Sequence, residues 1–391
     1  MRMKYANDDN LPHWKGEEEV KQIEVTFIGD KPYIKAAVNE QTELLFLIDS
    51  GASFTVLNDS EKVKRLSLKK GFEFFVGGWG DEEQSTAYQT TAASIAFAGI
   101  VYLDFKLAVI PLNKTKYFLS KEEMIYDGVI GHDILRNFSW TINRQQQQIF
   151  ISQQPYKKKN NEVEVPFDTF MSKLSIPIEV NFGGGHIIKH EAIIDTGSRH
   201  YLKLSSAFAE DYSQYFQAKI SATDFGLSGA AQHERVSLPN LSIANISYQH
   251  IKTNLIESDD EDDWWVIGNA LLSQGEYTLD YLSSKLILAP RQENLISSRY
   301  NLLGLELRKL TTGNFIVRYV FPNLPASQTN ITVGTVLTAI DDIPAKDISE
   351  NAWLDITNTS GKHTLCAQID TRQCWQIDAK EILGYSTPIS L

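Results

Sequence analysis

The chain carries the same pattern of segments twice, and this internal repeat constrains its fold more than any other feature. Residues 22–58 and 174–205 each contain a strand pattern, a turn and a second strand that runs into Asp-Ser-Gly or Asp-Thr-Gly. Residues 127–151 and 264–288 each contain Val-Ile-Gly, a short helical turn and two more strand-like segments. Because the two units carry these signals in the same order, the sequence predicts two related, mostly β lobes.

In each unit an apolar run ends at an aspartate, Asp49 in the first and Asp195 in the second. A glycine two positions later allows a sharp turn, and a hydroxyl side chain between them can hold the loop by hydrogen bonds. One such turn alone is commonplace. Two of them related by a pseudo-twofold axis would bring two carboxylates together. The turn residues are Ser50, Gly51, Thr196, Gly197 and Ser198.

Two carboxylates in one site cannot both ionise cheaply, so they hold one proton between them. Such a pair can activate water: one carboxylate takes a proton from the water while the other donates one to a carbonyl oxygen. We therefore expect Asp49 and Asp195 to form a catalytic pair. This chemistry requires no metal and no cofactor.

The doubled pattern resembles the pepsin and retropepsin superfamily of aspartic peptidases, in a bacterial form. The resemblance covers roughly residues 20–290. It implies a bilobal, mostly β protease with two retropepsin-like lobes, acting as an aspartic-type endopeptidase on peptide or protein substrates. It also implies that Gly131 and Gly268 support the two turns. The matching segments are residues 47–53, 129–131, 193–198 and 266–268.

A glycine-rich turn follows each aspartate and predicts a hairpin tip. The resemblance makes the first of these turns the flap over the substrate, formed by Gly77, Gly78, Trp79 and Gly80. The second, at residues 226–229, is expected to be a partial or degenerate flap.

The residues that follow the two glycines differ. Ser198 could donate a hydrogen bond to Asp195 and stabilise its ionised form, whereas Ala52 cannot do so for Asp49. We therefore expect Asp49 to hold the shared proton more often.

Arg199 and His200 depart from the family pattern. A buried arginine at this position would pair with a carboxylate and could damage the dyad, so we expect both side chains to face solvent.

Residues 300–383 differ in character and resemble a PDZ domain in their order of elements. In such a domain a peptide C-terminus adds a strand to the sheet edge, and backbone amides hold its carboxylate. The simpler alternative is a small sheet domain packed on the protease. The expected carboxylate loop is Leu302, Leu303, Gly304 and Leu305.

These signals divide the chain into four parts: an N-terminal extension, two protease lobes and a small α/β PDZ-like domain. Their expected bounds are 1–20, 21–160, 161–295 and 296–391.

The two cysteines, Cys366 and Cys374, flank a predicted hairpin turn and could face each other across two strands. A disulfide would imply an oxidising compartment. Two free buried thiols fit the spacing equally well.

The net charge of −12 argues against nucleic acid or an anionic membrane as the main partner, since both require a basic face. No apolar run is long enough to span a membrane. The first twenty residues lack a secretory signal, so the protein is either cytoplasmic or exported with its signal already removed. A monomer is expected, because one chain supplies both aspartates.

Two other interpretations of the function remain open. The protein could be a catalytically degenerate protease fold that serves as a peptide-binding adaptor. It could also be a latent enzyme in which residues 1–20 or the C-terminal domain cover the cleft.

Overall fold

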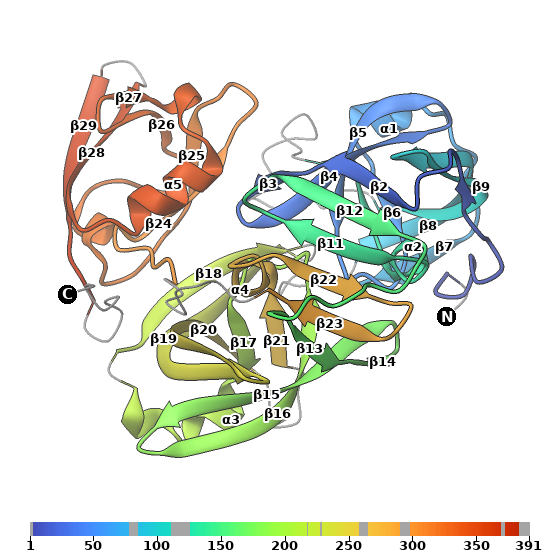
Figure 1. Cartoon of the computed structure of the whole chain (residues 1–391). Coiled ribbons are helices and arrows are strands. Elements are labelled where there is room, and N and C mark those ends of the chain that lie inside the picture. Colours follow the sequence, from blue (N-terminus) through green and yellow to red (C-terminus); the bar gives the residue numbers. More distant parts are fainter. Residues whose placement is uncertain are drawn as a thin grey trace.

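The protein is described from a computed structural model, with 53% of residues in strands and 11% in helices. Two β lobes lie side by side, and a third, smaller unit lies beside them (Figure 1). No helix among the described residues is long and apolar enough to cross a membrane. The structure describes residues 3–77, 85–110, 126–216, 218–226, 229–257, 265–289, 298–368 and 372–382.

The first lobe is a closed barrel. Its strands pair in the order β9-β6-β10-β5-β4-β8, and β8 pairs again with β9 to close the ring. Helices α1 (Glu61–Lys64) and α2 (His132–Leu135) complete the lobe. Its strands are β1 (His13–Trp14), β3 (Thr26–Ile28), β4 (Lys31–Val38), β5 (Gln41–Ile48), β6 (Val56–Asn58), β7 (Glu73–Val76), β8 (Ser85–Phe97), β9 (Ile100–Ile110) and β10 (Gly128–Ile130).

The second lobe repeats this barrel. Its ring runs β15-β16-β21-β17-β20-β19 and closes by pairing of β19 with β15. Helices α3 (Ser206–Glu210) and α4 (Asn269–Leu272) take the places of α1 and α2. Its strands are β14 (Asp168–Phe170), β15 (Lys173–Gly183), β16 (His186–Asp195), β17 (Leu202–Ser205), β18 (Ile220–Gly226), β19 (Gly229–Ile243), β20 (Ile246–Ile256) and β21 (Trp265–Gly268). The predicted bilobal, mostly β architecture is therefore confirmed.

A six-stranded sheet joins the lobes, in the order β13-β23-β22-β11-β12-β2. Its two central strands, β11 and β22, come from different lobes and pair antiparallel. On the axis between them the hydroxyls of Thr141 and Thr278 share a buried hydrogen bond of 2.8 Å. The strands are β2 (Val20–Glu24), β11 (Ser139–Asn143), β12 (Gln148–Ser152), β13 (Val163–Pro166), β22 (Tyr277–Asp280) and β23 (Lys285–Leu288).

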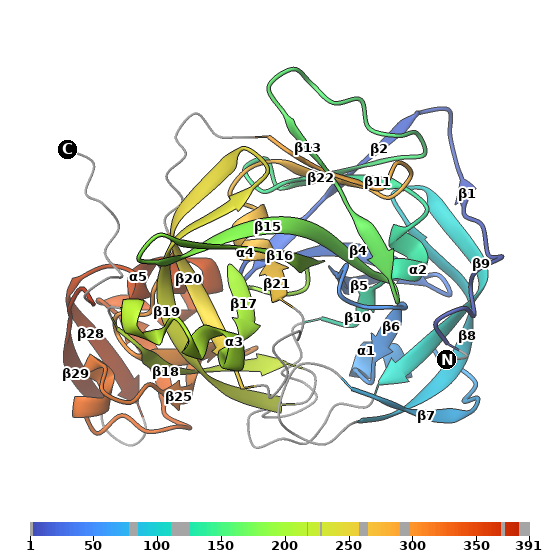
Figure 2. The same ribbon diagram turned by 90° about the horizontal axis from the view of Figure 1, so that it is seen from below.

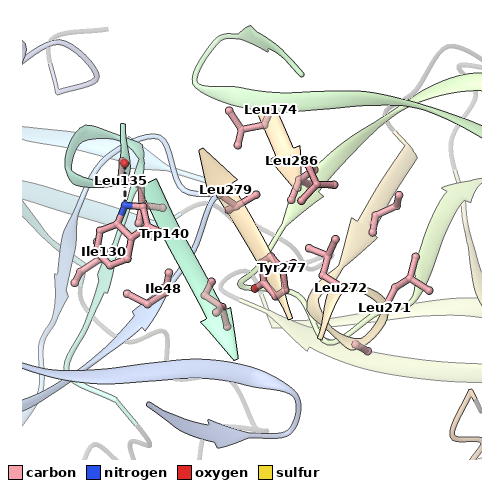
Figure 3. Packing of buried hydrophobic residues seen from close by; sticks show 14 of the residues in the cluster. Ile48, Ile130, Leu135, Trp140, Leu174, Leu271, Leu272, Tyr277, Leu279 and Leu286 are labelled. Carbon is pink, nitrogen blue, oxygen red and sulfur yellow. Dashed lines mark hydrogen bonds between the residues drawn. The ribbon is translucent and has the colours of Figure 1, made fainter. Parts of the chain in front are cut away.

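One continuous apolar core fills both barrels and the space beneath the joining sheet. Trp140 is fully buried there, and its indole N–H donates to the carbonyl oxygen of Leu135 at 2.9 Å (Figure 3). Tyr277 and Leu279 lie on the facing strand of the other lobe. Because the core is continuous, the lobes depend on each other for burial of apolar surface.

The N-terminal segment packs on the first lobe. Strand β1 pairs with β9, and Met3 is buried in an apolar cluster of that lobe. Asn7 Nδ2 donates to the carboxylate of Asp133 at 3.0 Å. Residues 3–20, predicted to be an extension, thus contribute to the lobe itself.

In its described residues, the C-terminal unit is one six-stranded sheet with a single α-helix, α5 (Glu350–Thr357). Its apolar core includes Ile220 and Ala222 of β18, so it packs on the second lobe. Cys366 and Cys374 lie opposite each other on adjacent strands and form a disulfide. The strands are β24 (Leu305–Lys309), β25 (Phe315–Val320), β26 (Val336–Ile340), β27 (Ile343–Pro344), β28 (Gly361–Gln368) and β29 (Arg372–Ala379).

A buried ionic cluster ties the three parts together. Asp30, 3% exposed in the turn between β3 and β4, pairs with Arg144 of the joining sheet and with Arg299, which precedes the C-terminal unit. Nearby, Asn351 of α5 donates to the carbonyl oxygen of Phe27 at 2.7 Å. The C-terminal unit therefore contacts both lobes, and Figure 2 shows it beside β18, β19 and β20 of the second lobe.

We expect Asp30→Asn to lower the free energy of unfolding at pH 7 by about 3 kcal/mol, because it leaves two arginines without their buried partner. Burial alone raises the pKa of Asp30, but the charges of Arg299 and Arg144 outweigh burial and lower it. The ion pairs of Asp30 therefore stabilise the protein at pH values above the ordinary range of carboxyl pKa values. This stabilisation falls as acid protonates Asp30.

Urea unfolding at pH 7 and below about pH 3, where the lowered pKa of Asp30 allows it to be protonated, tests this, with the exposed Asp168→Asn as control. An equal effect of both substitutions at pH 7 would show that the cluster does not stabilise the fold.

Candidate active site

Asp49 and Asp195 lie at the ends of the equivalent strands β5 and β16, facing each other across the boundary between the lobes. A Cβ atom built on Gly197 would lie 2.3 Å from Cγ of Asp49, and one built on Gly51 would lie 2.8 Å from Cγ of Asp195. Each glycine thus packs against the aspartate of the other lobe. Only glycine leaves room for this approach.

Four hydrogen bonds cross between the two turns. Ser50 Oγ donates to the carbonyl oxygen of Ile194 at 2.7 Å, and Thr196 Oγ1 donates to that of Ile48 at 2.8 Å. In return, the Ser50 amide donates to Thr196 Oγ1 at 3.0 Å and the Thr196 amide to Ser50 Oγ at 3.1 Å. Ser50 and Thr196 are fully buried. Each hydroxyl therefore satisfies two backbone groups of the opposite lobe.

Gly131 and Gly268 hold the turns from below. A Cβ on Gly131 would lie 2.6 Å from the backbone of Phe54, and one on Gly268 would lie 2.3 Å from the carbonyl oxygen of His200. The next amide in each lobe donates to the turn, to the carbonyl oxygens of Ala52 at 2.9 Å and of Ser198 at 2.8 Å. The geometry fits the supporting role expected for both glycines.

The environment raises the pKa of Asp49 to about 7. Burial is the largest cause, followed by the negative charge of Asp195 and a hydrogen bond to it. Asp195 Oδ1 is buried and has no hydrogen-bond partner among the described residues. Gly51 N donates to Asp49 Oδ1 at 2.7 Å. The arrangement favours one proton shared by the pair, held on Asp49.

Two lysines at equivalent positions flank the dyad. Lys31 pairs with Ile28 at the start of β4, and Lys173 pairs with Phe170 at the start of β15. Both lower the pKa of Asp49 and so oppose the effect of burial. The sequence analysis did not select them, although their matching places in the repeat could have pointed to them.

The residues after the second turn differ from expectation. Ser198 Oγ accepts a hydrogen bond from the His200 amide at 3.3 Å, and Ser198 donates to Asp195 only from its backbone amide, to the carbonyl oxygen at 3.2 Å, among the hydrogen bonds of the described residues. The carboxylate of Asp49 nevertheless has the raised pKa, which burial accounts for.

The prediction that Arg199 and His200 face solvent is wrong. Arg199 is half-buried and pairs with Glu306 of β24 at 2.5 Å and with Asp224 of β18 at 3.4 Å. His200 is buried, and its Nδ1 lies 2.6 Å from Nδ2 of Asn254. Arg199 has carboxylate partners outside the dyad. The active-site turn is thereby linked to the C-terminal unit.

Asp133 is a further buried carboxylate that the sequence analysis missed. Its Oδ1 accepts from Thr55 Oγ1 at 2.6 Å and from the Thr55 amide at 2.8 Å. Burial raises its pKa to about 6, and these hydrogen bonds oppose that shift. Thr55 Oγ1 also accepts from the amide of Gly131 at 3.1 Å. Asp133 therefore fixes the segment after the first turn.

The predicted flap residues follow β7 in the sequence, and β7 pairs with β8 up to Val76 and Ser85. Gly77 directly follows β7 and is exposed. Gly78, Trp79 and Gly80 lie outside the described residues. The hairpin begins close to the active site, since the Phe74 ring centroid is 6.2 Å from that of Phe54.

In the second lobe the corresponding hairpin is formed by β18 and β19. Gly226 pairs with Gly229, and the two residues between them lie outside the described part of the chain. The guanidinium of Arg318, in the C-terminal unit, stacks 3.5 Å from the centroid of Phe225. The C-terminal unit therefore contacts this hairpin directly.

In the C-terminal unit, the backbone amides of the expected carboxylate loop already bind a side chain of the same unit, that of Asn301. Asn301 Oδ1 accepts from the amides of Gly304 at 2.8 Å and Leu305 at 3.3 Å, while Asn301 Nδ2 donates to the carbonyl oxygen of Leu305 at 2.6 Å. Leu302, Leu303 and Leu305 are buried. A peptide carboxylate would have to displace Asn301 from these amides.

A cavity of about 470 Å³ opens beside Asp195 and reaches Gly51 of the other lobe. Its polar side chains are those of Asp195, Lys173, Lys203 and Ser205. In the part of the chain that the structure covers, no group of three or more His, Cys, Asp or Glu side chains is placed to hold a metal ion.

Comparison with protein families gives one match: residues 34–134 match the family described as Aspartyl protease. The matched segment contains Asp49, the β7–β8 hairpin and Gly131. No curated protein matches the chain. The match supports an aspartyl protease family for this chain, and with it a hydrolase of the protease class.

We expect Thr196→Val to lower the free energy of unfolding by about 2–4 kcal/mol, because it leaves the Ser50 amide and the Ile48 carbonyl buried without partners. Thr196→Ser keeps the hydroxyl and should cost about 1 kcal/mol for the lost methyl group. Urea unfolding of both variants checks this. Equal losses would mean that the crossed hydrogen bonds contribute nothing beyond packing.

Proposed function

We propose that the protein is an aspartic endopeptidase in which Asp49 and Asp195 activate water for peptide-bond hydrolysis. The observation that carries the proposal is the crossed arrangement of the two turns, in which each glycine packs on the opposite aspartate. It places two carboxylates against each other, and the pKa of Asp49 is raised to about 7. A binding role alone would not require two such carboxylates.

The proposed reaction uses the shared proton. Asp195 accepts a proton from the water, the water oxygen attacks the carbonyl carbon, and Asp49 donates its proton to the carbonyl oxygen. In the second step Asp195 passes its proton to the leaving nitrogen while Asp49 takes a proton from one hydroxyl of the diol, and the C–N bond breaks to give a carboxylic acid and an amine. The dyad ends with the single proton it began with.

The substrate would lie extended in the cleft between the barrels, beneath the β7–β8 hairpin. Ser50, Gly51, Thr196 and Gly197 keep the carboxylates in place. Residues 21–160 and 161–295 would form the two protease lobes. One chain supplies both halves, so the proposed enzyme acts as a monomer.

We propose a PDZ-like role for residues 296–391, as a domain that receives the C-terminus of a substrate or partner or that regulates the protease. The order of its elements and its edge strand β24 favour this role. Binding would begin with release of Asn301 from the amides of Gly304 and Leu305. Glu306 of the same strand pairs with Arg199 beside the active-site turn, which gives such a domain a route to the dyad.

Wild-type protein should cleave a denatured protein or a mixed peptide library between about pH 3 and 7, the range in which carboxyl dyads titrate. Asp49→Asn and Asp195→Asn should each reduce the rate by at least about a thousandfold, because neither leaves a pair able to exchange a proton. Mass spectrometry of the products measures this.

A statine-type transition-state mimic should inhibit the wild type. Folded wild-type protein that binds peptides but cleaves none would favour the adaptor reading. Activity retained in either variant would exclude this dyad.

The activity should fall as the pH rises through about 7, since Asp49 then loses the proton that the mechanism needs. Lys173 lowers the pKa of Asp49, so Lys173→Met should move this basic limb upward by about half a pH unit. The control is Lys189→Met, at an exposed position of the same lobe. A basic limb that stays in place or moves down would contradict the assigned charge effect.

A further inference from the structure

The cavity beside Asp195 has a counterpart in the first lobe, and the two differ in chemistry. Val129 pairs with Leu47 and Val56, and Val266 pairs with Ile193 and Lys203. Lys203 therefore occupies the position that Val56 holds in the first lobe.

In the first lobe this face is closed. Val56, Leu47 and Val129 are buried in an apolar cluster that Met3 joins from the N-terminal segment. In the second lobe the equivalent face is open and forms the wall of the 470 Å³ cavity. This volume is within the range of pockets that bind small ligands.

The charged residues that line the open cavity are two lysines and one carboxylate, that of Asp195. The half-buried Lys203 and Lys173 both line it. Ser205 lines it too: the residue is 2% exposed, and its Oγ has no hydrogen-bond partner among the described residues. Two ammonium groups and a buried hydroxyl are donors suited to a carboxylate, and charged donors make the stronger hydrogen bonds.

The remaining walls are apolar. Ile193, Val266 and Ile256 would cover the methylene groups of a side chain whose carboxylate reaches the lysines. The cavity also touches Asp195 and Gly51, so its occupant lies next to the reacting atoms. Its local charge is opposite in sign to the net charge of −12. At physiological salt, distant surface charges are screened over about 8 Å, so the lining residues, two lysines and Asp195, set the charge inside the cavity.

We propose that this cavity is a substrate subsite for an acidic side chain, with glutamate preferred, at a position adjacent to the scissile bond. The proposal rests on the proposed endopeptidase function and names the substrate class of that site. Lys203 and Lys173 are its specificity-determining residues. Glutamate is preferred over aspartate because its additional methylene lies along the apolar wall.

The test compares matched quenched-fluorescence peptides that differ only in Glu or Gln at a single position, moved in turn across the cleavage site. At one position the wild type should prefer Glu by about tenfold in kcat/KM, the effect of one charge-assisted hydrogen bond. Lys203→Met should bring the ratio close to one, and Lys203→Glu should favour a Lys peptide. The ratio is taken within each variant, so a change in overall rate cancels.

Lys189→Met is the matched control and should keep the wild-type ratio. Val56 shows that this strand position accepts an apolar residue, and a thermal melt of each variant verifies folding. A wild type that cleaves with equal efficiency at every Glu and Gln position would overturn the subsite and leave the endopeptidase proposal standing.

A second measurement separates the two proposals. Asp49→Asn protein should bind the Glu peptide about tenfold more tightly than the Gln peptide in fluorescence anisotropy, with the difference lost on adding Lys203→Met. Such binding without any wild-type cleavage would support the subsite and overturn the catalytic proposal. Equal binding of both peptides would overturn the subsite.

Discussion

The crossed hydrogen bonds between Ser50 and Thr196 are the interaction on which the rest of the site depends. Each hydroxyl serves a backbone group of the opposite lobe, and each neighbouring glycine lies against the opposite aspartate. Neither barrel alone therefore supplies all the groups that surround its own aspartate. The joining sheet and the shared core beneath it hold the two barrels in the relative position that these short contacts require. The arrangement buries two acidic side chains at one point. A single shared proton and the two flanking lysines reduce the electrostatic cost of this burial.

The C-terminal unit is bound to this centre by charge as well as by apolar contact. Arg199, four residues after Asp195, reaches Glu306 of the edge strand β24. Arg299 reaches Asp30, the neighbour of Lys31 in the first lobe. Both pairs are at least partly buried, so breaking them would leave poorly solvated charge. The domain is therefore part of the same folded body rather than a tethered addition. Any movement of β24 would act on the loop that carries Asp195.

The repeat made the fold predictable, because strand periodicity and the two Asp-Ser/Thr-Gly turns are local signals that the sequence records directly. Ser50 and Thr196 could be predicted to hold their loops, but their crossing into the opposite lobe is a tertiary contact. Arg199 and His200 were placed in solvent because their partners, Glu306 and Asn254, are far away in the sequence. Lys203 could not be predicted from the repeat, because a repeat records only what its halves share and the two lobes differ at this position. Register alone shows that Lys203 stands where the first lobe has a valine.

That substitution shows what a fused chain permits. A homodimer with one barrel per subunit must place every residue twice about its axis, so a lysine at this position would put a second positive charge in the opposite wall. Duplication within one polypeptide removes the constraint, and each barrel can change independently. Here an apolar cluster covers this face in the first barrel, whereas in the second barrel the equivalent face is open and lined by lysines. The two halves of the cleft therefore differ in chemistry, and a peptide bound in the reverse direction would make different contacts. A nearly symmetric scaffold can in this way distinguish the two directions of a peptide chain.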